Sequence, residues 1–188
     1  APPDTSKIPS YNPDMEYRRC GKTNMIMSAV CLGGHWKRID KVVPKRKKED
    51  GKGWLALGSG NPDFDKNRAD VVSRCIDRGI NYIDACWANE VIAYSKALKG
   101  RRDKMYLGYS WGVTEVRYPE WRTFEKLKQG FQQGLKEAGE EYVDLWRITC
   151  LEQSGQHDEA TIEERLKTPD CAKKAGLAHH THNSSHNR

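Results

Sequence analysis

Histidines gather near the carboxyl end of the chain, where imidazole groups are able to bind metal. His180 and His182 alternate as residues of a strand do, so we expect both side chains on one face, with His186 on the following loop. Together with Asp84 and Cys86, which end another predicted strand, they form a candidate transition-metal site. No complete ligand motif is present, so a frayed and partly exposed tail is the alternative interpretation.

Asp84 stands near the end of an apolar segment, residues 80–86, which has the composition of a buried strand. A carboxylate in this position either takes part in catalysis or accepts hydrogen bonds from the amides of the following loop. Trp87 and Trp111 follow predicted strand ends, and such aromatic residues either line a substrate pocket or pack loops against the protein. The sequence leaves both pairs of alternatives open.

A basic run lies between residues 37 and 50, with seven lysines and arginines against three acidic residues. The formal net charge of the whole chain is +6. A solvated loop is one interpretation of this run, and contact with an anion, a phosphate or a nucleic acid is another. No aromatic residue is interleaved with these cations. Because bases stack on aromatic rings in single-strand sites, nucleic acid is not the expected partner.

The six cysteines form no CxxC pair, which excludes zinc-ribbon and ferredoxin motifs. Cys75 lies on the apolar face of a predicted helix, and Cys31, Cys86 and Cys150 lie in or beside apolar strands, so we expect buried free thiols. No apolar stretch approaches the length of about 18 residues that marks a membrane span. The chain starts without Met, which fits a chain boundary or a mature end left by signal-peptide cleavage, so cytoplasmic and exported locations both stay open.

Strand and helix signals alternate along most of the chain. The predicted elements are an extended arm at 1–14, a hairpin at 17–27, a strand at 28–32, a long polar loop at 35–67 and four helix–strand pairs with strands at 80–86, 105–110, 142–151 and 177–183. Thr161 and Glu164 form a capping box for the last helix, and Pro169 is expected to kink or split that helix.

Alternating strands and helices predict a parallel sheet with covered faces. A closed (β/α)8 barrel runs to about 250 residues, whereas this chain of 188 residues supplies about five units after its hairpin. We therefore predict an α/β fold, a partial (β/α)8 TIM-type barrel, as one domain over 15–188 behind the arm at 1–14. An incomplete barrel has open sheet edges, and these predict pairing with a second copy or with another protein.

Several short segments carry a family resemblance in a fixed order. They span residues 15–23 with 28–34, 79–85, 96–104, 142–145, and 174–176 with 184–186. In this order the chain resembles the aldo-keto reductases from about residue 15 to its end, interrupted by the loop at 35–67. The resemblance implies a (β/α)8 barrel that reduces carbonyl groups with a nicotinamide cofactor, NADP(H).

The resemblance also implies a set of four catalytic residues at the strand ends. A tyrosine protonates the carbonyl oxygen, a lysine held by an aspartate lowers the pKa of that tyrosine, and a histidine orients the substrate. Asp84 matches the aspartate. The positions of the tyrosine, the lysine and the histidine fall on Asn89, Ser110 and Thr149. None of these three side chains acts as a proton donor with a pKa near neutrality.

The cofactor site that the resemblance implies is incomplete in this sequence. The family holds its dinucleotide mostly with the last three strand–loop units, which these 188 residues do not include. Only Ser184 and Ser185 remain, at a position that resembles the turn binding the carboxamide. We therefore do not expect tight binding of intact NADP(H).

Three hypotheses about function follow. The first is an aldo-keto-reductase-like domain without carbonyl reductase activity in this form, which acts as a binding or structural subunit of a homo-oligomer or a larger assembly. The second is an NAD(P)H-dependent oxidoreductase whose C-terminal cofactor-binding part is missing from this chain. The third, weaker hypothesis is anion or nucleic-acid binding through the basic loop.

Overall fold

A computed structural model describes residues 4–35, 61–86, 88–110, 119–149 and 158–184. Its helices are α1 (Pro62–Asp77), α2 (Ala88–Ala97), α4 (Phe124–Ala138) and α5 (Glu159–Lys174), with short 3-10 helices at Thr5–Lys7, Arg102–Lys104 and Pro119–Trp121. Its strands are β1 (Tyr17–Arg19), β2 (Ile26–Ser28), β3 (Leu32–Gly33), β4 (Tyr82–Ala85), β5 (Tyr106–Tyr109), β6 (Val143–Ile148) and β7 (Ala178–Asn183).

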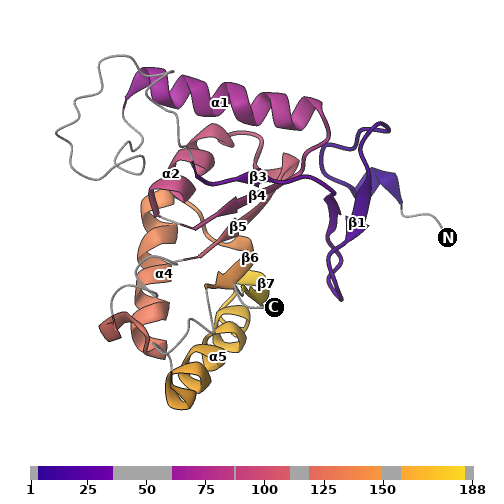
Figure 1. Ribbon diagram of the computed structural model, residues 1–188. Coiled ribbons are helices and arrows are strands. Elements are labelled where there is room, and N and C mark those ends of the chain that lie inside the picture. Colours follow the sequence, from indigo (N-terminus) through magenta and orange to yellow (C-terminus); the bar gives the residue numbers. More distant parts are fainter. Residues whose placement is uncertain (1–3, 36–60, 87, 111–118, 150–157, 185–188) are drawn as a thin grey trace.

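Strands β3 to β7 form a parallel sheet in the order of the sequence, and β1 pairs with β2 as an antiparallel hairpin. Figure 1 shows the helices following one face of this sheet, with the hairpin at the opposite side. Consecutive helices pack on one another, α1 on α2, α2 on α4 and α4 on α5. The predicted partial barrel, five parallel strands behind a hairpin, is confirmed.

Helix α1 begins inside the segment for which the sequence predicts a long loop. Asn61 caps it, because its Oδ1 accepts the backbone N–H groups of Asp63 at 3.0 Å and Phe64 at 3.2 Å. Pro62 occupies the first turn, where no N–H is needed and a fixed φ favours the helix. The Asn-Pro pair is thus a start signal. Residues 36–60 of the predicted loop, with the basic run, lie outside the described residues.

The strand predicted at 28–32 is wrong in its bounds. Ser28 ends β2, and β3 begins only at Leu32. Between them the Ser28 hydroxyl donates to the carbonyl oxygen of Val30 at 2.6 Å. Val30 is 54% exposed and Cys31 is exposed, so the buried thiol expected at Cys31 is also wrong. The chain has to turn here because it leaves an antiparallel hairpin and enters a parallel sheet.

Helix α5 begins three residues before the position that the capping box predicts. Its cap is Asp158, whose Oδ1 accepts the backbone N–H of Thr161 at 2.8 Å. Of the two outcomes expected at Pro169, a kink or a split, the split is wrong, since the helix continues through the proline. Thr168 and Ala172 on either side of the proline are buried, so packing against the sheet holds the helix together despite one missing hydrogen bond.

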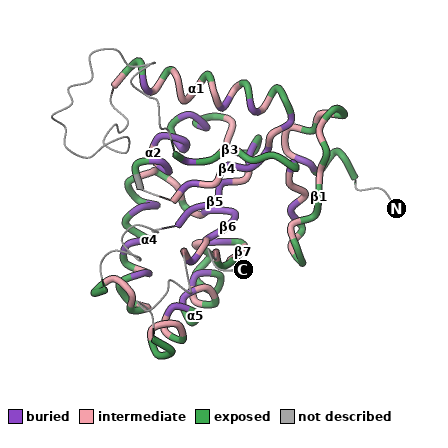
Figure 2. Tube along the Cα trace, in the orientation of Figure 1, coloured by how far each residue is buried: buried purple, intermediate pink, exposed green. Residues whose placement is uncertain are grey.

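The main core lies between the sheet and the helices. Phe131 of α4 stacks on Trp146 of β6 with ring centroids 4.0 Å apart, and on Tyr109 of β5 at 5.3 Å. Figure 2 shows the same arrangement as burial along the central strands and on the helix sides facing them. The strand face that meets the helices therefore has the apolar composition of a complete barrel's outer layer.

The opposite face of the sheet carries a smaller cluster. Met25 of the hairpin turn packs there with Tyr82 of β4 and Leu145 of β6. The hairpin is tied to the body through Tyr17, whose hydroxyl donates to the carbonyl oxygen of Gly79 at 3.0 Å. Ile8, in the predicted arm, is buried. This end of the inner face is therefore closed by the N-terminal segments. No helix in the described ranges has the length and apolarity to cross a membrane.

Candidate functional site

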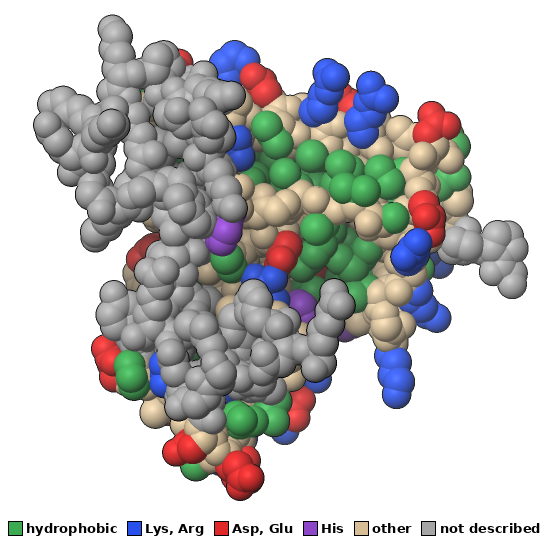
Figure 3. All heavy atoms as spheres, in the orientation of Figure 1, with side chains coloured by type: hydrophobic (Ala, Val, Ile, Leu, Met, Phe, Trp, Pro, Cys, Tyr) green, Lys and Arg blue, Asp and Glu red, His purple; other side chains and the backbone are tan. Residues whose placement is uncertain are grey.

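The carboxyl ends of parallel strands in barrels of this type carry ligands and catalytic groups. In this chain the segments after β3, β4 and β5 supply His35, Cys86 and Ser110 at that edge. Figure 3 shows charged and histidine side chains gathered in the middle of this view, beside the hydrophobic surface over the strands. Polar chemistry is thus concentrated where the fold predicts a site.

Asp84 forms an ion pair that the sequence did not reveal. Arg147 of β6 donates from Nη1 to Oδ2 of Asp84 at 2.5 Å and from Nη2 to the hydroxyl of Ser110 at 3.2 Å. The side chains of Arg147 and Asp84 are 14% and 28% exposed. Two of the four family positions, Asp84 and Ser110, therefore lie together. A guanidinium from a third strand stands between them.

The guanidinium of Arg147 keeps its charge in these surroundings. Burial works against the charged form of Arg147, but Asp84 and its hydrogen bond outweigh that effect and raise the pKa of the guanidinium. Tyr82 lies two residues before Asp84 on the same face and donates to Oδ1 at 3.4 Å. Burial, followed by the charge of Asp84, raises the pKa of Tyr82 far above its ordinary value. Neither the guanidinium of Arg147 nor the hydroxyl of Tyr82 gives up a proton near neutral pH.

The other two family positions lie elsewhere at this edge. Asn89 is in the first turn of α2 with its side chain exposed. Thr149 follows β6 directly, and its carbonyl oxygen accepts from the buried Arg165 of α5. Tyr94 and Lys96 are the tyrosine and the lysine nearest to Asn89 in the sequence, but they lie in α2, in the outer layer of helices. Tyr94 donates to the carbonyl oxygen of Gly33 at 3.1 Å, and Lys96 pairs with Asp65 of α1.

Of the predicted cofactor and metal residues, His180 and His182 lie in β7 and Ser184 directly follows it. Ser184 follows the strand, with its backbone N–H bonded to the carbonyl oxygen of Ile148 at 2.9 Å, and Ser185 and His186 lie outside the described residues. His182 is the register partner of Arg147. Desolvation lowers the pKa of His180 and His182, and the charge of Arg147 lowers that of His182 further. In the described ranges neither histidine joins a group of three metal-ligating side chains.

A different cluster shares only Cys86 with the metal site predicted from the sequence. His35, Cys86 and Glu90 place one ligand atom each within 4.8 Å of one another. His35 follows β3, Cys86 follows β4 and Glu90 lies in the first turn of α2. The spacing of Cys86 and Glu90 was visible, but His35 is more than fifty residues away and only the pairing of β3 with β4 brings it near.

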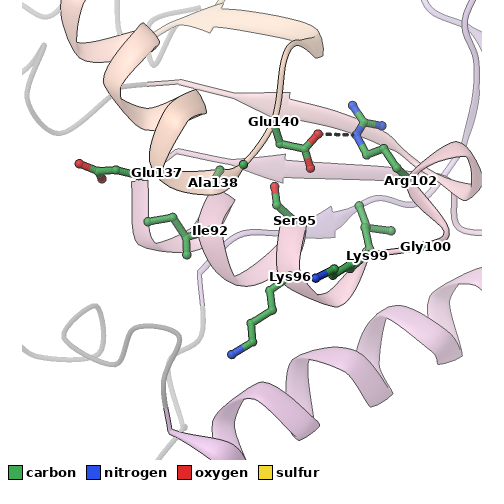
Figure 4. Close-up of a pocket in the computed structure, with 11 residues that line it drawn as sticks. Ile92, Ser95, Lys96, Lys99, Gly100, Arg102, Glu137, Ala138 and Glu140 are labelled. Atoms are coloured by element: carbon green, nitrogen blue, oxygen red, sulfur yellow. Dashed lines mark hydrogen bonds and ion pairs between the residues drawn. The ribbon is translucent and has the colours of Figure 1, made fainter.

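A groove of about 480 Å³ lies between α2 and the end of α4 (Figure 4). Arg102 and Glu140 point toward each other across it and form an ion pair of 3.2 Å. Its lining residues come from the helices and the turns after them, and the described strand ends contribute none. The groove is therefore separate from Asp84 and its neighbours.

The remaining predictions from the sequence concern cysteines, tryptophans and the basic run. Cys75 is buried as predicted, while Cys86 is only partly buried. The basic run, Trp87, Trp111 and Cys150 lie outside the described residues.

Comparisons with known proteins identify the fold. No protein-family model matches the sequence, and no curated protein sequence matches it. Among solved structures, an aldo-keto reductase from Bacillus halodurans in its holo form is similar, with 18% identity, 92% of this chain and 51% of that chain covered, and a TM-score of 0.64. An aldo-keto reductase structure from Pseudomonas aeruginosa gives 19% identity, 90% and 59% coverage, and a TM-score of 0.64.

An aldo-keto reductase from Klebsiella pneumoniae, solved in complex with NADP and acetate, is also similar. It shares 13% identity, with 87% of this chain and 47% of that chain covered and a TM-score of 0.61. The chain thus spans about half the length of the structures it matches. Over that length, the protein has the fold of the aldo-keto reductases.

Proposed function

We propose that these 188 residues form an aldo-keto-reductase-like partial barrel that does not reduce carbonyl groups by itself and acts as a binding or structural subunit. The observation that supports this most directly is the ion pair of Arg147 with Asp84. In the family that the chain resembles, the aspartate at the position of Asp84 holds a lysine. In this chain Asp84 holds the guanidinium of Arg147, and Ser110 stands at the lysine position.

The chemistry of reduction needs an acid that releases a proton to the carbonyl oxygen and recovers it near neutral pH. An arginine stays protonated in proteins, so it serves as a fixed positive charge but not as an acid. Tyr82 is the tyrosine in contact with Asp84, and its raised pKa keeps the proton on the hydroxyl. A group of this composition orients an anion or holds three strands together more readily than it transfers protons.

The subunit role rests on the edges of the sheet. Strands β3 and β7 are the outer strands of the five-stranded sheet, each paired on one side in the described structure. β7 spans six residues, and an edge of that length presents unpaired backbone groups that another strand is able to bond. A second copy of the chain or another protein would complete the sheet there.

A second candidate function is an NAD(P)H-dependent oxidoreductase whose cofactor-binding part lies outside these residues. It is favoured by the similarity to the Klebsiella pneumoniae structure with NADP and by the coverage of about half of that chain. In this case Ser184 would contact the nicotinamide end of the cofactor, and a proton donor would come from another segment.

Titration of the purified chain with NADPH, followed by cofactor fluorescence, distinguishes the two candidate functions. The proposal predicts no saturable binding, together with a mass above that of the 21.5 kDa monomer in size-exclusion chromatography with light scattering. Saturable binding that weakens in a Ser184→Ala variant would support the oxidoreductase instead. A monomer at all concentrations would contradict pairing with a second copy of the chain.

A further inference from the structure

We infer that His35, Cys86 and Glu90 form a binding site for a divalent transition metal, with Zn²⁺ the ion that their chemistry fits best. The three side chains converge from β3, β4 and α2 at the carboxyl edge of the sheet. Imidazole nitrogen, thiolate sulfur and carboxylate oxygen are the three ligand types that zinc takes in proteins. The inference is independent of the question of reductase activity.

The separation of the sulfur and nitrogen ligands matches such a site. The Cys86 Sγ lies 3.6 Å from Nε2 and 3.7 Å from Nδ1 of His35. Zinc bound tetrahedrally to a sulfur and a nitrogen at ordinary bond lengths holds these two atoms about 3.6 Å apart. The backbone therefore already places the thiol and the ring at the spacing that coordination needs.

Glu90 is the rigid ligand of the three. Its side chain is fully buried, and Oε2 accepts the backbone N–H of Cys86 at 2.8 Å. Oε1 faces Nδ1 of His35 at 2.5 Å. Burial raises the pKa of Glu90, with the hydrogen bonds from Cys86 and His35 opposing the rise. A buried carboxylate is costly unless a positive charge offsets it, and a metal ion supplies that charge.

Gly34 makes room for this carboxylate. A Cβ at residue 34 would clash with the Glu90 carboxylate and lie 3.0 Å from the Cα of Ala85. The backbone N–H of Gly34 also donates to the carbonyl oxygen of Asp84 at 2.7 Å, which fixes the segment that carries His35. The glycine thus allows β3 and α2 to approach closely enough to share a ligand.

Without metal, a hydrogen bond between His35 and Glu90 accounts for the short distance between them. A nitrogen and an oxygen bound to the same tetrahedral zinc ion lie about 3.4 Å apart. The His35 ring and the Glu90 carboxylate therefore have to move apart when metal binds. His35 is able to move because its side chain is 41% exposed. Burial and the charge of Glu90 raise the pKa of the Cys86 thiol to about 12. The thiol therefore starts protonated, and metal binding must release protons to the solvent.

Cobalt titration of the metal-free full chain tests the site, because Co²⁺ occupies zinc sites and gives a charge-transfer absorption with a bound thiolate. We expect one equivalent of Co²⁺ to produce this band and Zn²⁺ to displace it. A Cys86→Ser variant should lose the band. A His35→Ala variant should bind Zn²⁺ more weakly by more than about 100-fold, because a loss of up to about 100-fold in affinity is typical when only a residue that supports a metal ligand is removed. Circular dichroism verifies that both variants fold.

Matched controls use the thiol and the histidines that the structure places elsewhere. Cys31→Ser removes an exposed thiol after the hairpin, and a double His180→Ala, His182→Ala variant removes the histidines of β7. Both controls should retain the band and the affinity. Absence of stoichiometric binding in the unaltered chain, or binding that is lost in the β7 variant and kept in Cys86→Ser, would overturn the inference.

Discussion

The outer face of the sheet and its carboxyl edge are built from different kinds of contact. The outer face is apolar and continuous, with Phe131 stacked on both Trp146 and Tyr109. The carboxyl edge is polar, with Arg147 paired to Asp84 and Glu90 paired to His35. The outer layer packs the described helices against the sheet, while at the edge Asp84 pairs with Arg147, and Asn89 stands where the family resemblance implies the tyrosine. The apolar layer therefore stabilises the fold, and the polar edge carries the candidate sites.

The largest effect is expected from the outer face. Phe131→Ala removes a fully buried ring and both of its stacking contacts, and should lower the free energy of unfolding by about 3–5 kcal/mol. Urea denaturation followed by tryptophan fluorescence measures it. A loss below about 1 kcal/mol would mean that the helices do not depend on this core.

An intermediate effect is expected at the edge. Arg147→Met leaves Asp84 without its cation and should cost about 1–3 kcal/mol, discounted because both side chains keep some contact with solvent. Adding Asp84→Asn should recover part of that loss, and the double-mutant cycle gives the coupling energy. Strict additivity of the two changes would show that the ion pair contributes nothing to stability.

A pH-dependent difference is expected at Glu90. Burial raises its pKa above the ordinary value of 4.5, so the native state holds this proton more tightly than the unfolded chain does. The stability of the natural chain relative to Glu90→Gln should therefore fall as pH rises from about 4.5 through the raised pKa, with a slope that approaches about 1.4 kcal/mol per pH unit between the unfolded and native pKa values. Urea midpoints of both proteins across this range, with a chelator present, measure the difference, and a constant difference would contradict the assignment.

The smallest effect is expected at the rim of the helix layer. Asn61→Ala removes the cap of α1 and should cost about 1 kcal/mol, whereas Asn61→Ser keeps an acceptor and should cost less. Thermal unfolding of the two variants compares them. Equal losses would indicate that the start of α1 depends on other contacts.

Local signals were sufficient for most of the fold. The spacing of Leu127, Phe131 and Leu135 is typical of an amphipathic helix, and the glycine that follows is a typical helix end. The structure has α4 at this place, with Gly139 in the left-handed conformation at its end. Where two residues close together in the sequence are both able to cap a helix, the sequence alone did not show which one does. Thr161 was predicted to cap α5, but Asp158 does so because it is able to accept the N–H of Thr161.

The site depended on contacts that no local pattern carries. Asp84 was found by its place in a strand, but its partner Arg147 comes from a strand 63 residues later. In the sequence, Arg147 only interrupts an apolar run. The same holds for His35, which becomes a neighbour of Glu90 only when β3 pairs with β4. Strand order determines these contacts, and the resemblance to a family with a different set of residues did not point to them.

The central claim is that the edge around Asp84 does not transfer a proton to a carbonyl oxygen. NADPH-dependent reduction of a panel of aldehydes by the purified chain, with Asp84→Asn as the matched control, tests it directly. The account predicts the same background rate for both proteins. Turnover above background in the natural chain that disappears in Asp84→Asn would contradict it.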